Sequence, residues 1–115
     1  MHITQQQWVT LGSARFAIQM WGTIRRTLNY DEPPPEDFAG FCRRSSAGAL
    51  RYGLRDELSQ ARFVFAAWVL GEEFHVRIPA LRLVLQDPEL SNLERSAALI
   101  SFMQVFFGEL LAQGE

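Results

Sequence analysis

The chain has 115 residues, of which 48% are hydrophobic and 21% are charged. This balance is typical of a globular protein and not of a disordered one, and the length fits a single domain spanning residues 1–115. The net charge of −2 disfavours nucleic acid as a partner, because a phosphate-binding groove needs a basic excess. Cys42 is the single cysteine, which excludes an internal disulfide and a multi-cysteine zinc site and suggests a small core residue.

The sequence also bears on location. No run approaches the roughly 20 apolar residues that a bilayer span needs, so we expect no membrane partner. The first residues, Met1 to Gln5, lack the basic region and the apolar run of a signal peptide. We therefore expect a cytoplasmic protein.

The first expected helix spans residues 5–28. Thr4 is its predicted N-cap, because Gln7 follows three residues later and completes the spacing of a capping box. Apolar residues recur at helical spacing and predict its buried stripe, which consists of Val9, Phe16, Met20, Ile24 and Leu28. The prolines at 33–35 end this helix, because they remove amide donors.

A second helix is expected at about 35–52, with Glu36 and Asp37 in its first turn, where negative charge meets the positive end of the helix dipole. Its expected buried face consists of Phe38, Phe41, Cys42, Ala49 and Tyr52. Gly53 is a favourable left-handed stop. Asp56 then caps a helix at about 57–70 that is apolar nearly all round, so we expect it to lie centrally among the others and to end at Gly71.

Two more helices complete the prediction. Pro79 fits the first position of a short helix that stops before Asp87. Ser91 and Glu94 form a second capping box, which opens a last helix to about Leu111. Its expected stripe consists of Leu93, Ala97, Ile100, Met103, Phe107, Leu110 and Leu111. No segment alternates like a strand, so the sequence predicts an all-α fold, a compact bundle of about five helices around the 57–70 helix.

The sequence contains no recognisable catalytic or metal-binding pattern. Glu72 and His75 have the Glu-x-x-His spacing of di-iron bundles, but such a site needs a second copy, and the only other histidine, His2, is in no such motif. No nucleophile elbow or phosphate-binding glycine loop is present. We therefore expect no enzyme activity, no catalytic residues, no cofactor and no bound metal.

Aromatic residues are the most informative part of the composition. Nine Phe, three Trp and two Tyr are more than a five-helix domain easily encloses, so some are expected at a partner surface. The candidate partner-binding residues are Trp8, Trp21, Phe106 and Phe107. The alternative, that these rings close a well-packed core, is about equally favoured by the pattern.

From Cys42 to Leu90 the chain resembles a family of small proteins encoded beside bacterial type VI secretion effectors, spike proteins and their adaptors. The resemblance rests on five elements, which are Tyr52-Gly53-Leu54, Glu57, Ala61 to Val64 with Phe63, Leu70 to Phe74 with Gly71, and Leu85 to Ser91 with Asp87 and Pro88. The opening Ile3 to Gln7 is also similar, and together these stretches cover about half of the chain. Such proteins often have Asp where this chain has His75, which puts that turn in doubt.

The resemblance implies an accessory role without enzyme activity. A protein of this kind binds an adaptor or effector from a neighbouring gene and supports its loading, as a co-chaperone or adaptor subunit. Homo-oligomerisation stays open. The first alternative is an immunity protein that binds and neutralises a toxin. The second is a small helical enzyme or ligand-binding domain that uses His75, Glu72 and Arg77. Transcriptional regulation is disfavoured by the charge balance and by the lack of a clear recognition helix.

Overall fold

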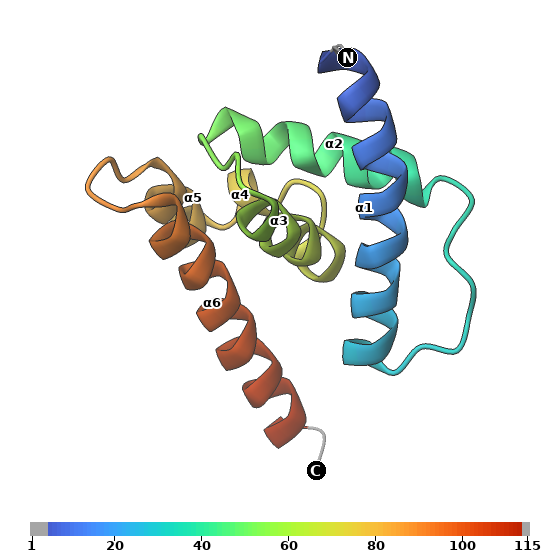
Figure 1. Ribbon diagram of the computed structural model, residues 1–115. Coiled ribbons are helices and arrows are strands. Elements are labelled where there is room, and N and C mark those ends of the chain that lie inside the picture. Colours follow the sequence, from blue (N-terminus) through green and yellow to red (C-terminus); the bar gives the residue numbers. More distant parts are fainter. Residues whose placement is uncertain (1–4, 114–115) are drawn as a thin grey trace. The chain divides into compact units, whose positions relative to one another are not determined.

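A computed structural model describes the backbone of residues 5–113 and the side chains of residues 14–105. The helices are α1 (Gln5–Leu28), α2 (Phe38–Arg51), α3 (Glu57–Leu70), α4 (Phe74–Arg77), α5 (Pro79–Gln86) and α6 (Asn92–Gln113) (Figure 1). Residues 5–113 contain no strand, which confirms the predicted all-α class. No helix among these residues meets the length and hydropathy needed to cross a membrane.

The chain divides into two compact units, Met1–Ser45, here unit 1, and Ser46–Glu115, here unit 2. Helix α2 runs through the boundary between them. The expectation of one domain over the whole chain stays a prediction. Each unit is described by itself below.

Unit 1 is held together by aromatic rings from α1 and the start of α2. The α1 bounds match the predicted residues 5–28, while the predicted cap Thr4 and the stripe residue Val9 lie outside the described side chains. Trp21 stands edge-on against Phe38, with ring centroids 5.2 Å apart, and the Tyr30 centroid lies 6.0 Å from that of Trp21. The indole therefore packs inside unit 1.

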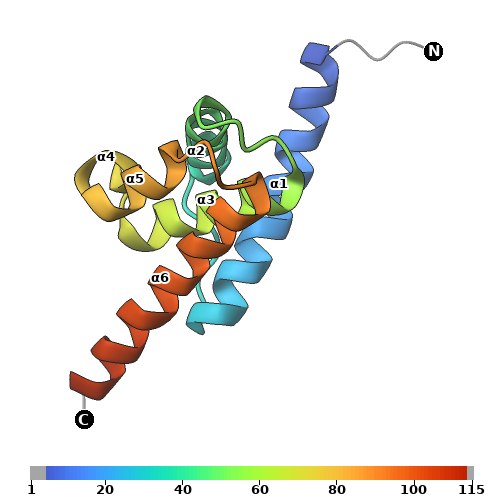
Figure 2. The same ribbon diagram turned by 90° about the vertical axis from the view of Figure 1, so that its left-hand side faces the viewer.

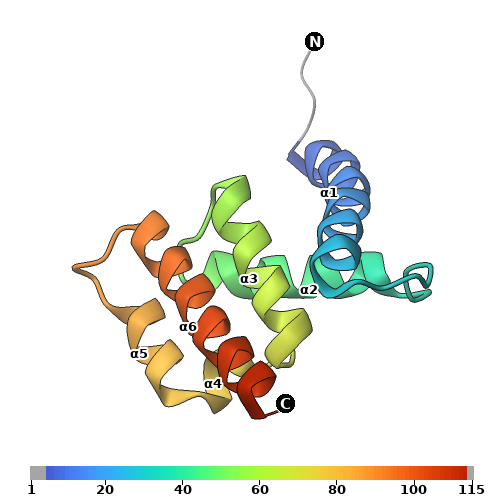
Figure 3. The same ribbon diagram turned by 90° about the horizontal axis from the view of Figure 1, so that it is seen from below.

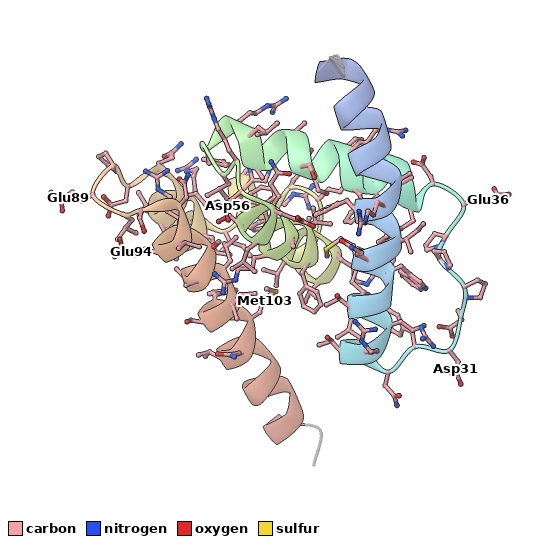
Figure 4. All side chains as sticks on the ribbon, in the orientation of Figure 1. Asp31, Glu36, Asp56, Glu89, Glu94 and Met103 are labelled. Carbon is pink, nitrogen blue, oxygen red and sulfur yellow. The ribbon has the colours of Figure 1, made fainter. Side chains whose placement is uncertain are left out.

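Backbone conformation and hydrogen bonding, and not the prolines alone, set the end of α1 and the start of α2. Asn29 adopts a left-handed φ of 59°, and the Tyr30 amide donates to the Arg25 carbonyl, so α1 ends in a Schellman-type cap before the prolines. The connecting segment with Asp31 and Glu36 is labelled in Figure 4.

The second helix begins at Phe38, three residues later than the expected residue 35. The reason is a turn at the end of the proline run, in which the Phe38 amide donates to the Pro35 carbonyl at 3.1 Å. Glu36 and Asp37 therefore precede the first turn of α2, and the expectation that they lie within it was wrong. The Asp37 carboxylate instead forms an ion pair with the Arg44 guanidinium, and the nitrogen and oxygen atoms are 3.0 Å apart.

Unit 2 is built around the contact between α3 and α6. Helix α6 also packs on α5, and α4 packs on both α3 and α5 (Figure 3). Figure 2 shows α4 and α5 beside each other and α6 crossing next to α3. The largest fully buried side chains of the unit come from its helices and from the α2–α3 turn, and include Leu54, Phe63, Phe74, Leu85 and Leu99.

Helix α3 has the predicted bounds and the predicted cap. The Ser59 amide donates to the Asp56 carboxylate at 2.9 Å, and Gly71 ends the helix with a φ of 109°. The helix is less buried than we expected from its nearly uniform apolar sequence. Ser59, Phe63, Val64, Ala66 and Ala67 are buried, whereas Leu58 is 51% exposed and Phe65, Trp68, Val69 and Leu70 are half-buried.

The buried stripe of α6 is rotated from the predicted one. Ser91 and Glu94 form the expected capping box, with reciprocal hydrogen bonds of 3.0 and 3.1 Å. Leu93 is 55% exposed and Ala97 is also exposed, so the prediction of these two residues as part of the stripe was wrong. Ser96, Leu99 and Met103 are buried instead, and Figure 4 shows Met103 on the side of α6 toward α3.

Small hydroxyls explain this rotation. The Ser59 and Ser96 hydroxyls lie 3.2 Å apart, and the Ser96 hydroxyl also accepts from the Arg62 guanidinium at 3.1 Å. Two serines let the helix backbones approach closely, while their hydroxyl groups satisfy each other. Because a serine does not register as an apolar stripe residue, the hydrophobic pattern indicated the neighbouring face.

The Arg95 side chain connects three segments of unit 2. Its Nε and Nη2 atoms donate to the Asp87 carbonyl at 3.1 and 2.7 Å, and Nη1 donates to the Tyr52 carbonyl at 2.9 Å. Arg95 lies in α6, Asp87 follows α5 and Tyr52 follows α2. One guanidinium therefore fixes the end of two helices against the start of a third.

We predict that Arg95→Met lowers the free energy of unfolding by about 2 kcal/mol, because two backbone carbonyls lose charged donors. Urea denaturation followed by circular dichroism measures the change. Arg55→Met is the matched control, since Arg55 is exposed, and its effect should stay within about 0.5 kcal/mol. Equal losses in the two variants would contradict the role given to Arg95.

Candidate functional site

Four rings from three segments meet in unit 2, and we call the group Tyr52, Phe63, Phe74 and His75 the Tyr52 junction. The Phe63 and Phe74 centroids lie 4.9 Å apart. His75 stands edge-on to Tyr52 at 5.4 Å and lies 5.5 Å from Phe63. The junction joins the end of α2, the middle of α3 and the short helix α4.

A hydrogen bond closes the junction. The Tyr52 hydroxyl and the His75 Nδ1 atom are 2.8 Å apart. A neutral imidazole with its proton on Nε2 accepts the Tyr52 proton at Nδ1, which satisfies both polar atoms. Burial lowers the pKa of His75, the positive charge of Arg51 lowers it further, and Glu73 partly opposes them. The neutral form is therefore favoured near pH 7.

Burial has the opposite effect on the phenol. It raises the pKa of Tyr52, while the positive charges of Arg82 and Arg51 act to lower it. The hydroxyl therefore stays protonated near neutral pH and remains a donor to His75. The pair is a neutral hydrogen bond next to the apolar rings of Phe63 and Phe74.

Gly48 of α2 packs against two rings of the junction. A Cβ atom added to Gly48 would lie 3.3 Å from Cε1 of Phe63 and 3.9 Å from Nε2 of His75. Both rings thus pack directly on the helix backbone. A Cβ atom at this position would require the Phe63 ring to move by a few tenths of an ångström, whereas its distance to His75 is an ordinary van der Waals contact.

The backbone next to the junction is fixed by side chains. The carbonyls of Tyr52, Gly53 and Leu54 accept from Arg95, Asn92 and Gln60, at 2.9, 2.8 and 3.2 Å. Gly53 adopts a φ of 80°, and the Leu54 amide donates to the Ala49 carbonyl, as the predicted left-handed stop requires. The α2–α3 turn is therefore tied to α6 at two successive residues.

The structure brings most of the family-like residues together. Tyr52, Phe63 and Phe74 form the junction, and Leu54 is fully buried beside the turn at Gly53. The Phe74 amide donates to the Gly71 carbonyl, which starts α4. Three of the family-like residues are exposed instead, namely Glu57 in the first turn of α3, Gly71 at the end of α3 and Pro88 after α5.

Two contributors to this region were not singled out by the sequence. Arg95 and Asn92 reach the α2–α3 turn across about 40 residues of chain, and Asp87 offers its carbonyl to Arg95. The sequence predicted that both residues lie in the first turn of a capped helix, but it did not indicate which carbonyl groups accept their hydrogen bonds. A backbone acceptor leaves no pattern in the sequence.

The predicted partner-binding aromatics are distributed differently. Trp21 is only 9% exposed and packs on Phe38, so its assignment to an exposed partner surface is corrected to a core position. The indole is covered because the α1–α2 connection returns Tyr30 and Phe38 to the same side of α1. Trp8, Phe106 and Phe107 lie outside the described side chains.

His75 and Arg77, two residues of the enzyme or ligand-site alternative, have different partners in the structure. Arg77 pairs with Glu73 at 3.6 Å, and both are exposed, whereas the His75 ring turns inward to Tyr52. Among the described residues, no three His, Cys, Asp or Glu side chains gather as metal ligands would. Burial raises the pKa of Cys42 to about 11, so its thiol stays protonated at neutral pH.

Comparison of the chain with protein-family models, with curated proteins and with solved structures finds no match. The resemblance to proteins encoded beside type VI secretion genes therefore stays a prediction from the residues of this chain.

We predict opposite effects for the same substitution at two glycines. Gly48→Ala should destabilise the protein by about 1 kcal/mol, because the cost of overpacking the fully buried Phe63 exceeds the gain in helix propensity. Gly22→Ala is the matched control, since its nearest neighbour is the flexible end of Arg26 at 3.6 Å, and it should be neutral or stabilising. The midpoints of urea denaturation show the sign of each change in stability, and a stabilising Gly48→Ala would contradict the close packing at Gly48.

We also predict a pH dependence of stability that belongs to His75. Its folded pKa lies below the ordinary value of 6.5, so the unfolded chain binds the proton more tightly. Stability should be full above pH 6.5 and should fall as the pH decreases from there through the folded pKa. Urea denaturation at a series of pH values measures this slope. The variant His75→Gln should lose it, and an unchanged slope in that variant would assign the dependence elsewhere.

Proposed function

We propose that this chain is a non-enzymatic protein-binding module, a co-chaperone or adaptor subunit that acts in the cytoplasm and supports the loading of a type VI secretion effector. The resemblance in residues 42–90 supports the setting. The exposed apolar surface of unit 2 supports the binding role, because burial of such side chains against a partner lowers the free energy of the complex.

That exposed surface is aliphatic. Within residues 46–105 of unit 2, the large apolar side chains that are at least half exposed are Leu50, Leu58, Val76, Leu83, Leu93 and Val105. Within residues 14–105 the aromatic rings are buried or half-buried. The rings thus build the interior, and leucine and valine provide the outward apolar contacts.

The observation that carries the proposal is a pair of leucines at one end of the α3–α6 contact. Leu58 is 51% and Leu93 is 55% exposed, and they lie in the first turns of α3 and α6. These turns adjoin, since the Ser59 hydroxyl donates to the Asn92 carbonyl at 3.4 Å. Two outward leucines on adjoining, capped helix ends are suited to dock an apolar segment of a partner.

We predict that Leu58→Glu combined with Leu93→Glu abolishes capture of the partner. Glutamate in a first helical turn is compatible with the helix dipole, so the fold should be retained. The chain is co-expressed with the products of its neighbouring genes, and the co-purified amount of each is measured. Wild type should retain an adaptor or effector, and the double variant should retain at least about tenfold less, a loss of 1.4 kcal/mol or more.

The matched control is Val76→Glu combined with Val105→Glu, which changes two residues of unit 2 that are 54% and 64% exposed but lie in α4 and in a later turn of α6. It should capture the partner as wild type does. Equal capture by all three forms would reject the leucine pair as the docking site. A wild-type chain that captures none of the neighbouring products would reject the proposed function.

A further inference from the structure

Arg62 is a close neighbour of both outward leucines at the α3–α6 contact. It follows Leu58 by four residues in α3, and its Nη1 atom donates to the Ser96 hydroxyl of α6 at 3.1 Å. Ser96 in turn follows Leu93 by three residues in α6. Because residues three or four positions apart are neighbours on a helix surface, Leu58, Arg62 and Leu93 lie on one surface that spans both helices.

The fold uses only part of the Arg62 guanidinium. Within residues 14–105 the Ser96 hydroxyl is its single hydrogen-bond acceptor, and no carboxylate pairs with it. The Nε and Nη2 atoms are not buried, so they are free to donate to a partner. These two atoms form one edge of the guanidinium, and their parallel N–H groups match the two oxygens of a carboxylate. Since Nη1 is held by Ser96 and the residue is half-buried, this edge has a fixed direction.

The carboxylates near the two leucines have other roles. Those of Asp56 and Glu94 accept backbone amides of their own capping turns, at 2.9 and 3.0 Å. Glu57 precedes Arg62 by five residues, and a helix turns by about 100° per residue, so these two side chains point to different faces of α3. Among the described residues the Nε–Nη2 edge therefore has no counter-ion.

A partner that covers Leu58 and Leu93 also removes Arg62 from water. A guanidinium loses hydration when it is covered, and only an acceptor that pairs with it offsets this cost. A wholly apolar segment supplies no acceptor, and a neutral amide supplies weaker hydrogen bonds than a carboxylate does. The two leucines and the arginine together therefore favour an apolar segment that carries negative charge.

We propose that Leu58, Arg62 and Leu93 form one docking surface for an apolar segment of the partner protein that carries an acidic side chain between its apolar ones. The carboxylate accepts from Nε and Nη2 of Arg62, and the flanking apolar side chains cover the two leucines. Arginine is among the residues that most often dominate the binding energy of protein interfaces. This inference rests on the proposed protein-binding function and specifies the chemistry of the partner at the same surface.

The test uses the whole chain and three labelled peptides of equal length with blocked ends. Each peptide carries two leucines, and the residue midway between them is glutamate, glutamine or lysine. Fluorescence anisotropy should give a Kd at least about fivefold lower for the glutamate peptide than for the glutamine peptide, because hydrogen bonds to a charged acceptor are stronger. The lysine peptide should bind most weakly, and added salt should reduce the differences.

Substitution of Arg62 shows whether this residue causes the preference for glutamate. Arg62→Met should bind the glutamate and glutamine peptides equally, and Arg62→Lys, which keeps the charge without the planar fork, should retain a smaller preference. Arg55→Met is the matched control, because Arg55 is exposed and precedes α3, and it should keep the full preference. Circular dichroism checks that each variant is folded, and Arg62→Lys decides alone if Arg62→Met does not fold.

The inference is overturned if the wild-type chain binds the glutamine peptide as tightly as the glutamate peptide, or binds none of the three. It is also overturned if the Arg62 substitutions reduce the preference no more than Arg55→Met does. The proposed function is judged separately, by capture of a neighbouring gene product. A chain that captures such a product without preferring glutamate disproves only this inference, whereas a chain that captures none rejects the proposed function.

Discussion

The guanidinium of Arg95 is the interaction on which the arrangement of unit 2 depends. It holds the carbonyls of Tyr52 and Asp87 at once, and so ties the ends of α2 and α5 to the first turn of α6. Asn92 extends the connection to Gly53. Because these acceptors are backbone atoms, the interaction fixes where the helices end and not only how their side chains pack. Both the Tyr52 junction and the first turns of α3 and α6 inherit their positions from it.

The proposed contact region at the α3–α6 contact follows from this arrangement. The adjoining first turns of α3 and α6 present Leu58 and Leu93. The region is composed of residues from two helices, so it exists only when unit 2 is folded. A partner that binds it would therefore stabilise the folded chain by mass action. This behaviour suits a subunit that works by holding another protein.

Local signals in the sequence predicted the helices well, and spatial contacts account for what they missed. Asp56 and Ser91 cap helix starts with their own side chains, and Gly71 and Pro79 set helix ends through their own backbone geometry, so a linear pattern was enough. Helix α4 has four residues and is too short to show a helical period, so the sequence did not predict this additional helix. The rotated stripe of α6 depends on Ser59 and Ser96 meeting across two helices, which the pattern of apolar residues does not encode.

The candidate site was predictable only in part. Tyr52, Phe63 and Phe74 were identified through the resemblance, but their convergence with His75 and Gly48 depends on tertiary packing. The surplus of aromatic residues suggested exposed rings, whereas Trp21 is buried and the exposed apolar side chains of residues 14–105 are aliphatic. Composition counts rings without showing which neighbours cover them.

Native-state amide hydrogen exchange at Gly53 and Leu54 tests the central claim most directly. Their amides donate to the carbonyls of Leu50 and Ala49 within the turn that Arg95 and Asn92 hold in place. If this turn is the fixed point of unit 2, both amides should exchange only through global unfolding, with the same free energy as the core of α3. Exchange at a free energy close to that of fraying helix ends would contradict the account.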